Sequence, residues 1–234
     1  MKIQHICRPV WRMISVTVRW GRYPRDFVCD PERKLVYLSN PKVACSSIKA
    51  SMFGSKPDIH AYTRPFKKTD LTPEMENYYK FSFVRNPYER LVSCYEDKCV
   101  KQFRFWDDYL FGYLSDVADF TDFVKRISKI PDCVAEPHFA GQYRLTHDRR
   151  GRCLVDYIGK VESLKEEFAP ISERFGLLPL PHTNRVASLV DKKWMDYYTL
   201  ETAELVYRKY KRDFVTFGYT DEYKMLKDYL KKKK

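Results

Sequence analysis

The sequence predicts an α/β protein with a mostly parallel central sheet flanked by helices on both faces. Three observations support this prediction. Apolar, β-prone runs alternate with segments of helical periodicity, and two of the strand-to-helix junctions carry both a cation and a proline. The 234 residues are also 44% hydrophobic and 16% aromatic, which is typical of a folded chain. Strands that alternate with helices favour parallel pairing, because a parallel connection needs a crossover segment.

The predicted elements follow one another in chain order. Residues 34–39 are predicted to form a buried strand, and residues 46–53 the helix after it. Residues 80–84 form the second strand, and Pro87 suits the first turn of a helix that continues to about Val100. The remaining predicted elements are a helix at 119–129, a strand at 154–158, a helix at 164–175 and a helix at 200–214.

Length, charge and cysteine content limit the organisation and the partners. We expect one domain at 34–220, an N-terminal extension at 1–33 and a basic C-terminal tail at 221–234. The net charge of +12 favours an anionic partner, although part of it comes from the lysines of the tail. Seven cysteines without paired spacing indicate neither a disulfide framework nor a zinc site. No nucleic-acid motif and no membrane span is evident in the sequence.

Two segments about forty residues apart carry the strongest functional pattern. In the first, an apolar run is followed by Asn40-Pro41-Lys42 and then by Ser46 and Ser47. In the second, an apolar run is followed by Arg85-Asn86-Pro87 and then by Ser93. A strand that ends in a turn and opens into a helix directs backbone N–H groups and a positive dipole end at one point. The pair therefore predicts a clamp for a ligand with two separated phosphate-type groups.

The two segments resemble the cofactor loops of the PAPS-dependent carbohydrate sulfotransferase family, of the HNK-1 and chondroitin/dermatan type with bacterial relatives. Three further motifs in the same order extend the resemblance over about 35–219: Glu136-Pro137-His138-Phe139, Ile158-Gly159-Lys160 and the ending Tyr210-Lys211-Arg212-Asp213-Phe214. The resemblance implies a P-loop-like three-layer fold and PAPS (3′-phosphoadenylyl sulfate) as co-substrate, with no metal.

The resemblance also assigns residues to the donor. Arg85 and Ser93 would bind the 3′-phosphate, and Lys42 would contact the bridging oxygen at which the sulfuryl group is cleaved. The 5′-phosphosulfate would be held by the first loop, which comprises Lys42, Val43, Ala44, Cys45, Ser46 and Ser47.

The reaction needs a base for the acceptor hydroxyl, and histidine is the side chain best suited near neutral pH. His60 lies between the two loops, in the interval where the family carries a catalytic histidine or acid. His138 lies in the His-aromatic motif, and Asp58 is an acidic alternative. Both histidines are candidate catalytic residues beside Lys42, with His60 predicted to take the proton and His138 as its substitute.

We therefore expect a sulfotransferase that moves a sulfuryl group from PAPS to a hydroxyl of a carbohydrate or another acceptor. The alternatives are an atypical P-loop-like kinase, with Asp156 as a possible magnesium ligand, and a non-catalytic polyanion-binding module. We expect no nucleic acid as partner and no membrane association. The expected location is the cytoplasm, or the Golgi lumen if an N-terminal anchor has been trimmed.

Overall fold

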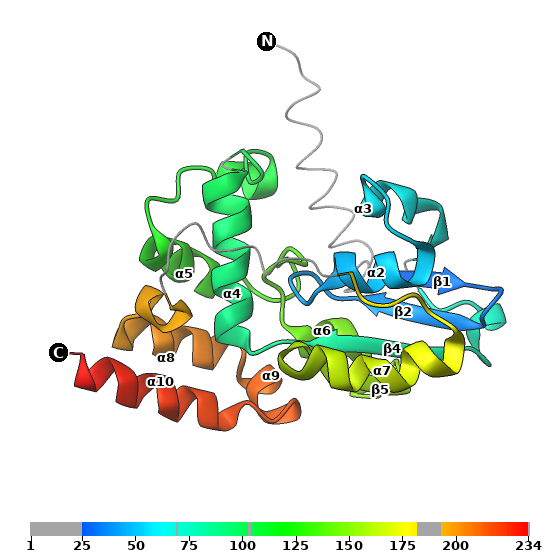
Figure 1. Cartoon of the computed structure of the whole chain (residues 1–234). Coiled ribbons are helices and arrows are strands. Elements are labelled where there is room, and N and C mark those ends of the chain that lie inside the picture. The colour runs from blue at the N-terminus through cyan, green and yellow to red at the C-terminus, as the bar shows by residue number, and fades with distance from the viewer. Residues whose placement is uncertain (1–24, 69, 103, 182–192, 234) are drawn as a thin grey trace, which may run out of the picture. The chain divides into compact units, whose positions relative to one another are not determined.

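The structure is a computed structural model that describes residues 25–68, 70–102, 104–181 and 193–233 (Figure 1). The chain divides into two compact units, each described by itself. The described part of unit 1 comprises residues 86–102, 104–143 and 193–233, and that of unit 2 comprises residues 25–68, 70–85 and 144–181. No helix within these residues is long and apolar enough to cross a membrane.

Unit 2 is built on a five-stranded sheet of order β3-β1-β2-β4-β5. Its strands are β1 (Asp26–Asp30), β2 (Leu35–Ser39), β3 (Lys67–Lys68), β4 (Tyr79–Val84) and β5 (Tyr157–Lys160). Strands β2, β4 and β5 run parallel, whereas β1 is antiparallel to both β2 and β3. The prediction of a mostly parallel sheet is therefore correct only for the β2-β4-β5 half. A hairpin turn at 31–34 reverses the chain, and it places β1 beside β2 within the expected N-terminal extension.

One face of this sheet is covered by two helices. Tyr37, Phe81 and Phe83 are fully buried there and pack with α2 (Cys45–Phe53) and α7 (Leu164–Phe175) in one apolar cluster. On the other face, Val36 and Leu38 pack with Met75 of the 3-10 turn η2 (Pro73–Met75) and with an irregular segment at 154–155. Within unit 2 the helices α2 and α7 thus share one face of the sheet, and the helical element on the other face is the short turn η2.

Gly159 in β5 is required by the packing of that first face. It lies opposite Phe83 in the parallel register between β4 and β5. A Cβ atom at residue 159 would clash with the Phe83 ring, which is fully buried and cannot turn into solvent. The glycine of the Ile158-Gly159-Lys160 motif thus makes room for an aromatic core side chain.

Unit 1 is helical. Its elements are α4 (Pro87–Tyr95), the π-helical turn η3 (Glu96–Lys101), η4 (Tyr109–Gly112), α5 (Phe120–Ser128), η6 (Trp194–Tyr197), α8 (Leu200–Lys209), α9 (Lys211–Thr216) and α10 (Thr220–Lys232). The short helix α6 (Gln142–Thr146) spans the boundary between the units, and unit 2 also contains α3 (Ile59–Tyr62), η1 (Arg64–Phe66) and η5 (Val161–Ser163). Tyr88 of α4 lies at the centre of an aromatic core, 5.0 Å from the ring centroids of both Tyr198 and Phe214.

The expected basic tail is largely a helix. Helix α10 buries Leu226 and Leu230, while its terminal lysines are exposed. Glu222 accepts a hydrogen bond from the Asn86 side chain, and Tyr223 donates one to Glu204 of α8. The spacing of the two buried leucines, four residues apart, places both on one side of the helix. The lysine run at 231–233 is thus the last turn of a packed helix rather than the end of an unstructured tail.

Candidate functional site

The loop between β2 and α2 has an unusual backbone. Lys42 and Ala44 both have positive φ angles, 69° and 59°, although neither is a glycine. Successive residues that alternate in handedness turn their N–H groups toward a common point and form an anion-binding concavity. The loop is held at its start and at its middle, because Asn40 donates to the carbonyl of Phe83 over 3.3 Å and Val43 is fully buried in the core.

The N-terminus of α2 is suited to an external anion. Ala44 is its N-cap residue, and no side chain caps the helix. The first turn also contains no acidic residue, so no carboxylate of the helix offsets its positive dipole end. The first turn of any α-helix lacks intrahelical acceptors for its N–H groups. In that turn Cys45 is half-buried, Ser46 is exposed and Ser47 is buried.

His60 contacts this helix directly. Its Nε2 lies 2.8 Å from Ser46 Oγ, and its Nδ1 lies 3.2 Å from the ammonium of Lys49, a side chain with 1% exposure. An ammonium can only donate, so Nδ1 accepts from Lys49 and the neutral ring carries its proton on Nε2. His60 is then a hydrogen-bond donor toward Ser46, and a second proton on the ring would have to displace the Lys49 contact.

Asp58, the acidic alternative, has a structural role. Its carboxylate caps α3 and accepts from the N–H of Ala61 over 2.9 Å. This hydrogen bond lowers the pKa of Asp58, with smaller contributions from His60 and Arg64. A carboxylate that is held ionised in this way is a weak proton acceptor. The capping role of Asp58 therefore accounts for its place beside His60.

The second predicted loop crosses the boundary between the units. Arg85 follows directly on β4 in unit 2, whereas Ser93 lies on α4 in unit 1, and both are half-buried. Asn86 caps α4 by accepting from the N–H of Tyr88 over 2.9 Å, and Pro87 occupies the first helical turn. The junction thus has the predicted form of a strand, a break and a capped helix.

His138, in unit 1, has a different environment from His60. Its Nδ1 lies 2.9 and 3.0 Å from the two carboxylate oxygens of Glu136, which also accepts the backbone N–H of His138. A carboxylate can only accept, so the Nδ1 proton stays on the ring and Nε2 carries the lone pair. Within the described part of the chain, Nε2 has no hydrogen-bond partner. The edge of the imidazole packs against Phe105, with ring centroids 5.3 Å apart.

Two partners of the candidate site were not predicted from the sequence. Lys49 and Glu136 determine the tautomers of His60 and His138, and neither residue was assigned this role from the sequence, although Glu136 stands in the His-aromatic motif. The contact between Glu136 and His138 could have been predicted from their spacing, because a carboxylate two residues before a histidine can reach its ring.

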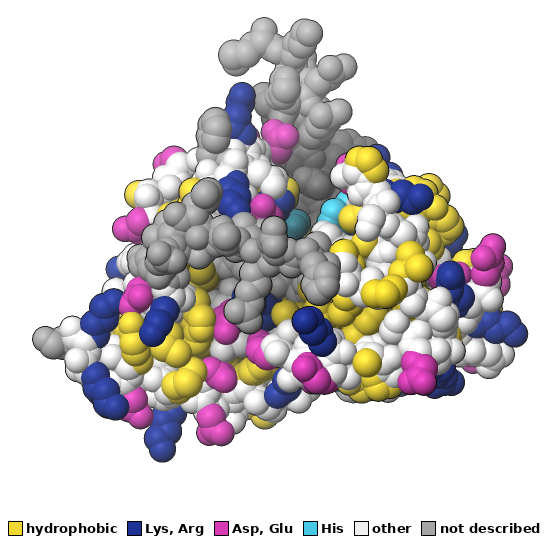
Figure 2. Space-filling view, viewed as in Figure 1, with side chains coloured by type: hydrophobic (Ala, Val, Ile, Leu, Met, Phe, Trp, Pro, Cys, Tyr) yellow, Lys and Arg dark blue, Asp and Glu magenta, His cyan; other side chains and the backbone are white. Residues whose placement is uncertain are grey.

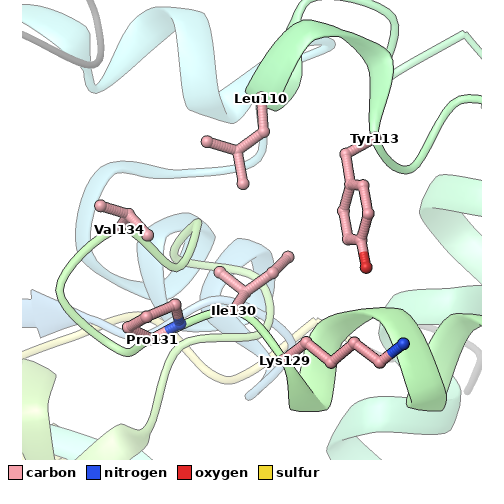
Figure 3. A pocket seen from close by; sticks show the side chains of 6 residues that line it. All are labelled: Leu110, Tyr113, Lys129, Ile130, Pro131 and Val134. Atoms are coloured by element: carbon pink, nitrogen blue, oxygen red, sulfur yellow. The ribbon is translucent and has the colours of Figure 1, made fainter.

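The predicted site residues do not line the cavity found in unit 1, and no metal site is found among the described residues. A cavity of about 270 Å³ in unit 1 is lined by Leu110, Tyr113, Lys129, Ile130, Pro131 and Val134, none of them a predicted site residue (Figure 3). Among the described residues, no group of three or more His, Cys, Asp or Glu side chains could hold a metal ion. On the face drawn in Figure 2, Lys and Arg side chains are scattered among Asp and Glu rather than gathered into one field.

Comparison with known proteins identifies relatives over most of the chain. The model of the sulfotransferase family matches residues 25–220, which include both loops and both candidate histidines. Carbohydrate sulfotransferase 12 of Mus musculus is 23% identical, over 86% of this chain and 61% of its own length. Carbohydrate sulfotransferase 11 of Mus musculus is 25% identical, over 84% of this chain and 67% of its own length.

Carbohydrate sulfotransferase 14 of Danio rerio is 27% identical, over 83% of this chain and 62% of its own length. The chain thus spans about three fifths to two thirds of the length of these relatives. No solved structure matches the chain significantly.

Proposed function

This chain belongs to the sulfotransferase family, and we propose that it transfers a sulfuryl group from PAPS to a hydroxyl of a carbohydrate. The family match over residues 25–220 carries this proposal. The loop geometry supports it but would by itself fit many phosphate ligands. The names of the relatives, all carbohydrate sulfotransferases, support a sugar hydroxyl as the acceptor.

The residues of the first loop fit the phosphosulfate of the donor. The alternating backbone at 42–44, the uncapped start of α2 and the Lys42 cation all favour an anion at this place. We propose that this is a P-loop-like junction in which backbone N–H groups from Lys42 to Ser47 surround the anion. Arg85 and Ser93 would bind the 3′-phosphate, since a guanidinium can bind a phosphate with two parallel hydrogen bonds.

Bound PAPS supplies the activated sulfuryl group, and the chain supplies position and charge. Lys42 would stabilise the negative charge that develops on the leaving oxygen as the bond to sulfur breaks. His60, with its proton on Nε2, would hold Ser46 and donate toward the anion side of the loop. These roles require no change in the tautomers that the hydrogen bonds determine.

We propose His138 as the base that takes the proton of the acceptor hydroxyl. Its lone pair lies on Nε2, and Glu136 would stabilise the imidazolium that forms when Nε2 is protonated. His60 is less suited to this role, because its acceptor nitrogen is occupied by Lys49. The hydrogen bonds thus favour different roles for the two candidate histidines.

The kinase alternative fits the structure less well. A magnesium ligand would be needed near the phosphate loop, at the carboxyl ends of the parallel strands. Asp156 instead precedes β5, at the amino end of that strand, where it accepts from the N–H of Lys80 over 2.7 Å. The carboxyl ends of β2, β4 and β5 lie together at the other end of these parallel strands.

Calorimetry in EDTA should show binding of 3′,5′-ADP, and labelled PAPS should transfer sulfate to at least one member of a glycan panel. Titration with ATP and Mg²⁺ is the matched comparison. Binding of ATP only in the presence of Mg²⁺, with no binding of 3′,5′-ADP, would replace the proposal by the kinase alternative. If neither nucleotide binds, the chain is a polyanion-binding module rather than a transferase.

A further inference from the structure

We propose that Arg90 and Asp213 are positioning residues, which hold the backbone on both sides of His138 so that its imidazole is fixed for proton transfer. The inference deepens the proposed function and rests on His138 as the base. All the residues concerned lie in unit 1. None of the sequence motifs assigns this role to either residue, and neither side chain is in reach of solvent.

Arg90 holds the two ends of the turn that carries His138. Its side chain lies on α4, with the residue only 3% exposed. One guanidinium nitrogen donates to the carbonyl of Pro137 and the other to that of Ala140, each over 2.8 Å. The planar fork of arginine suits two acceptors at a fixed separation.

Asp213 holds the next part of the same segment. Its carboxylate accepts from the N–H of Gln142 over 2.7 Å and from that of Tyr143 over 2.8 Å. These are the first two residues of α6, so Asp213 satisfies N–H groups that have no acceptor within that helix. The residue is 1% exposed and comes from α9, seventy residues further along the chain.

Two residues shortly before Asp213 hold further carbonyls, one within this segment and one eight residues before His138. The hydroxyl of Tyr210 donates to the carbonyl of Phe139 over 2.5 Å, and the ammonium of Lys209 donates to that of Ile130 over 2.8 Å. The carbonyls of Pro137, Phe139 and Ala140 are thus each bound by a side chain from α4 or from the junction of α8 and α9. A buried, irregular backbone needs such partners, because an unpaired carbonyl there costs about 1–3 kcal/mol.

These contacts hold the backbone around His138 in place, and the Glu136 carboxylate then holds the His138 ring in one orientation. Residues 139–142 are all buried, whereas His138 itself is only half-buried. The bonds from His138 to Glu136 can persist only if the backbone between Glu136 and Ala140 stays in place. Because a displacement of about 1 Å can slow a reaction about 100-fold, loosening this segment should reduce turnover more than binding.

The first test is a mutant cycle. Arg90→Lys keeps a positive charge but can serve only one of the two carbonyls well. We expect kcat to fall about 10–100-fold with KM and the Kd for 3′,5′-ADP unchanged. In a His138→Ala background the same substitution should cause no further loss. Arg126→Lys, which changes another arginine of unit 1 with carboxylate and carbonyl partners, should keep wild-type turnover.

Tyr210→Phe provides a milder variant, because it removes only the hydroxyl bound to the carbonyl of Phe139. It should also lower kcat, but only several-fold. This variant can replace Arg90→Lys in the test if Arg90→Lys fails to fold. An equal loss of kcat from either substitution with and without His138 would overturn the positioning role.

The second test does not depend on catalysis. A long-range ¹H–¹⁵N spectrum of the histidine rings, assigned with His138→Ala, reports which ring nitrogen of His138 carries the proton. We expect Nδ1–H in the wild type and a mixture of tautomers in Arg90→Lys. An unchanged tautomer in the variant would also overturn the positioning role. Wild-type turnover in His138→Ala would instead refute the base assignment, and the spectrum would then still decide whether Arg90 orders the ring.

Discussion

The carboxyl of Asp213 should titrate near pH 6 in the folded protein. Burial raises its pKa from 3.8 to about 6, because the ionised form loses its water. The N–H groups of Tyr143 and Gln142 and the charge of Arg90 oppose this shift, since each stabilises the carboxylate. The charge of Asp132 acts in the same direction as burial, and the net direction shows that the two together exceed these three favourable contacts.

The raised pKa makes stability depend on pH in a defined direction. Because the folded state holds the proton more tightly than the unfolded state, Asp213 contributes most to the free energy of unfolding below pH 3.8. That contribution is lost as the pH rises through about 6. The two pKa values give a full difference of about 3 kcal/mol, of which about 1.3 kcal/mol falls between pH 7 and pH 5.

Urea unfolding followed by tryptophan fluorescence would measure this contribution in the wild type and in Asp213→Asn, which cannot titrate. The free energy of unfolding of the wild type, minus that of the variant, should rise by about 1.3 kcal/mol as the pH falls from 7 to 5. Asp108→Asn, at an exposed carboxyl, measures the effect of removing one negative charge. A constant difference would refute the reasoning. A difference that falls with falling pH would mean that the hydrogen bonds and Arg90 outweigh burial.

Three further predictions concern the loops and the sheet. Lys42→Ala should lower kcat about 10²–10³-fold, while the Kd for 3′,5′-ADP, measured by calorimetry, stays close to wild type. Weaker binding at unchanged kcat would mean that Lys42 binds the donor and does not stabilise the transition state. Arg85→Ala should weaken 3′,5′-ADP about 10–150-fold through the loss of a charge-assisted hydrogen bond, and an unchanged Kd would remove Arg85 from the site. Gly159→Ala should lower the free energy of unfolding by about 1–3 kcal/mol, and Phe83→Leu in the same chain should recover part of the loss; additive losses would contradict the clash.

The elements beside the two loops could be predicted because their signals are local. Strand β2 is almost wholly apolar and β4 is rich in aromatic residues, and each is soon followed by a proline that a strand interior does not accommodate. The strand β1 was missed because it stands in a basic, mixed segment and is short, so its pairing with β2 depends on the hairpin at 31–34. The strand predicted at 154–158 begins only at Tyr157, because Leu154 and Val155 pack on the second face of the sheet.

The chemical environment of the site depends on side-chain contacts that cannot be read from the sequence. The sequence favoured His60 as the base because it lies between the two loops, and it left His138 as the substitute. Their tautomers depend on Lys49, eleven residues before His60, and on Glu136, two residues before His138. The partners of Asp213 lie seventy residues away, and only the folded chain brings them together.

The first loop combines two features that each cost stability in the free chain. A residue other than glycine in the left-handed region costs about 1–2 kcal/mol, and this loop has two, Lys42 and Ala44. The start of α2 also lacks a capping side chain, which in other helices contributes about 1 kcal/mol. The strained backbone persists because Asn40 anchors the start of the loop and the buried Val43 anchors it between the two strained residues. A bound anion would satisfy the N–H groups that a cap would otherwise satisfy, so the same loop that weakens the free protein would stabilise the liganded one.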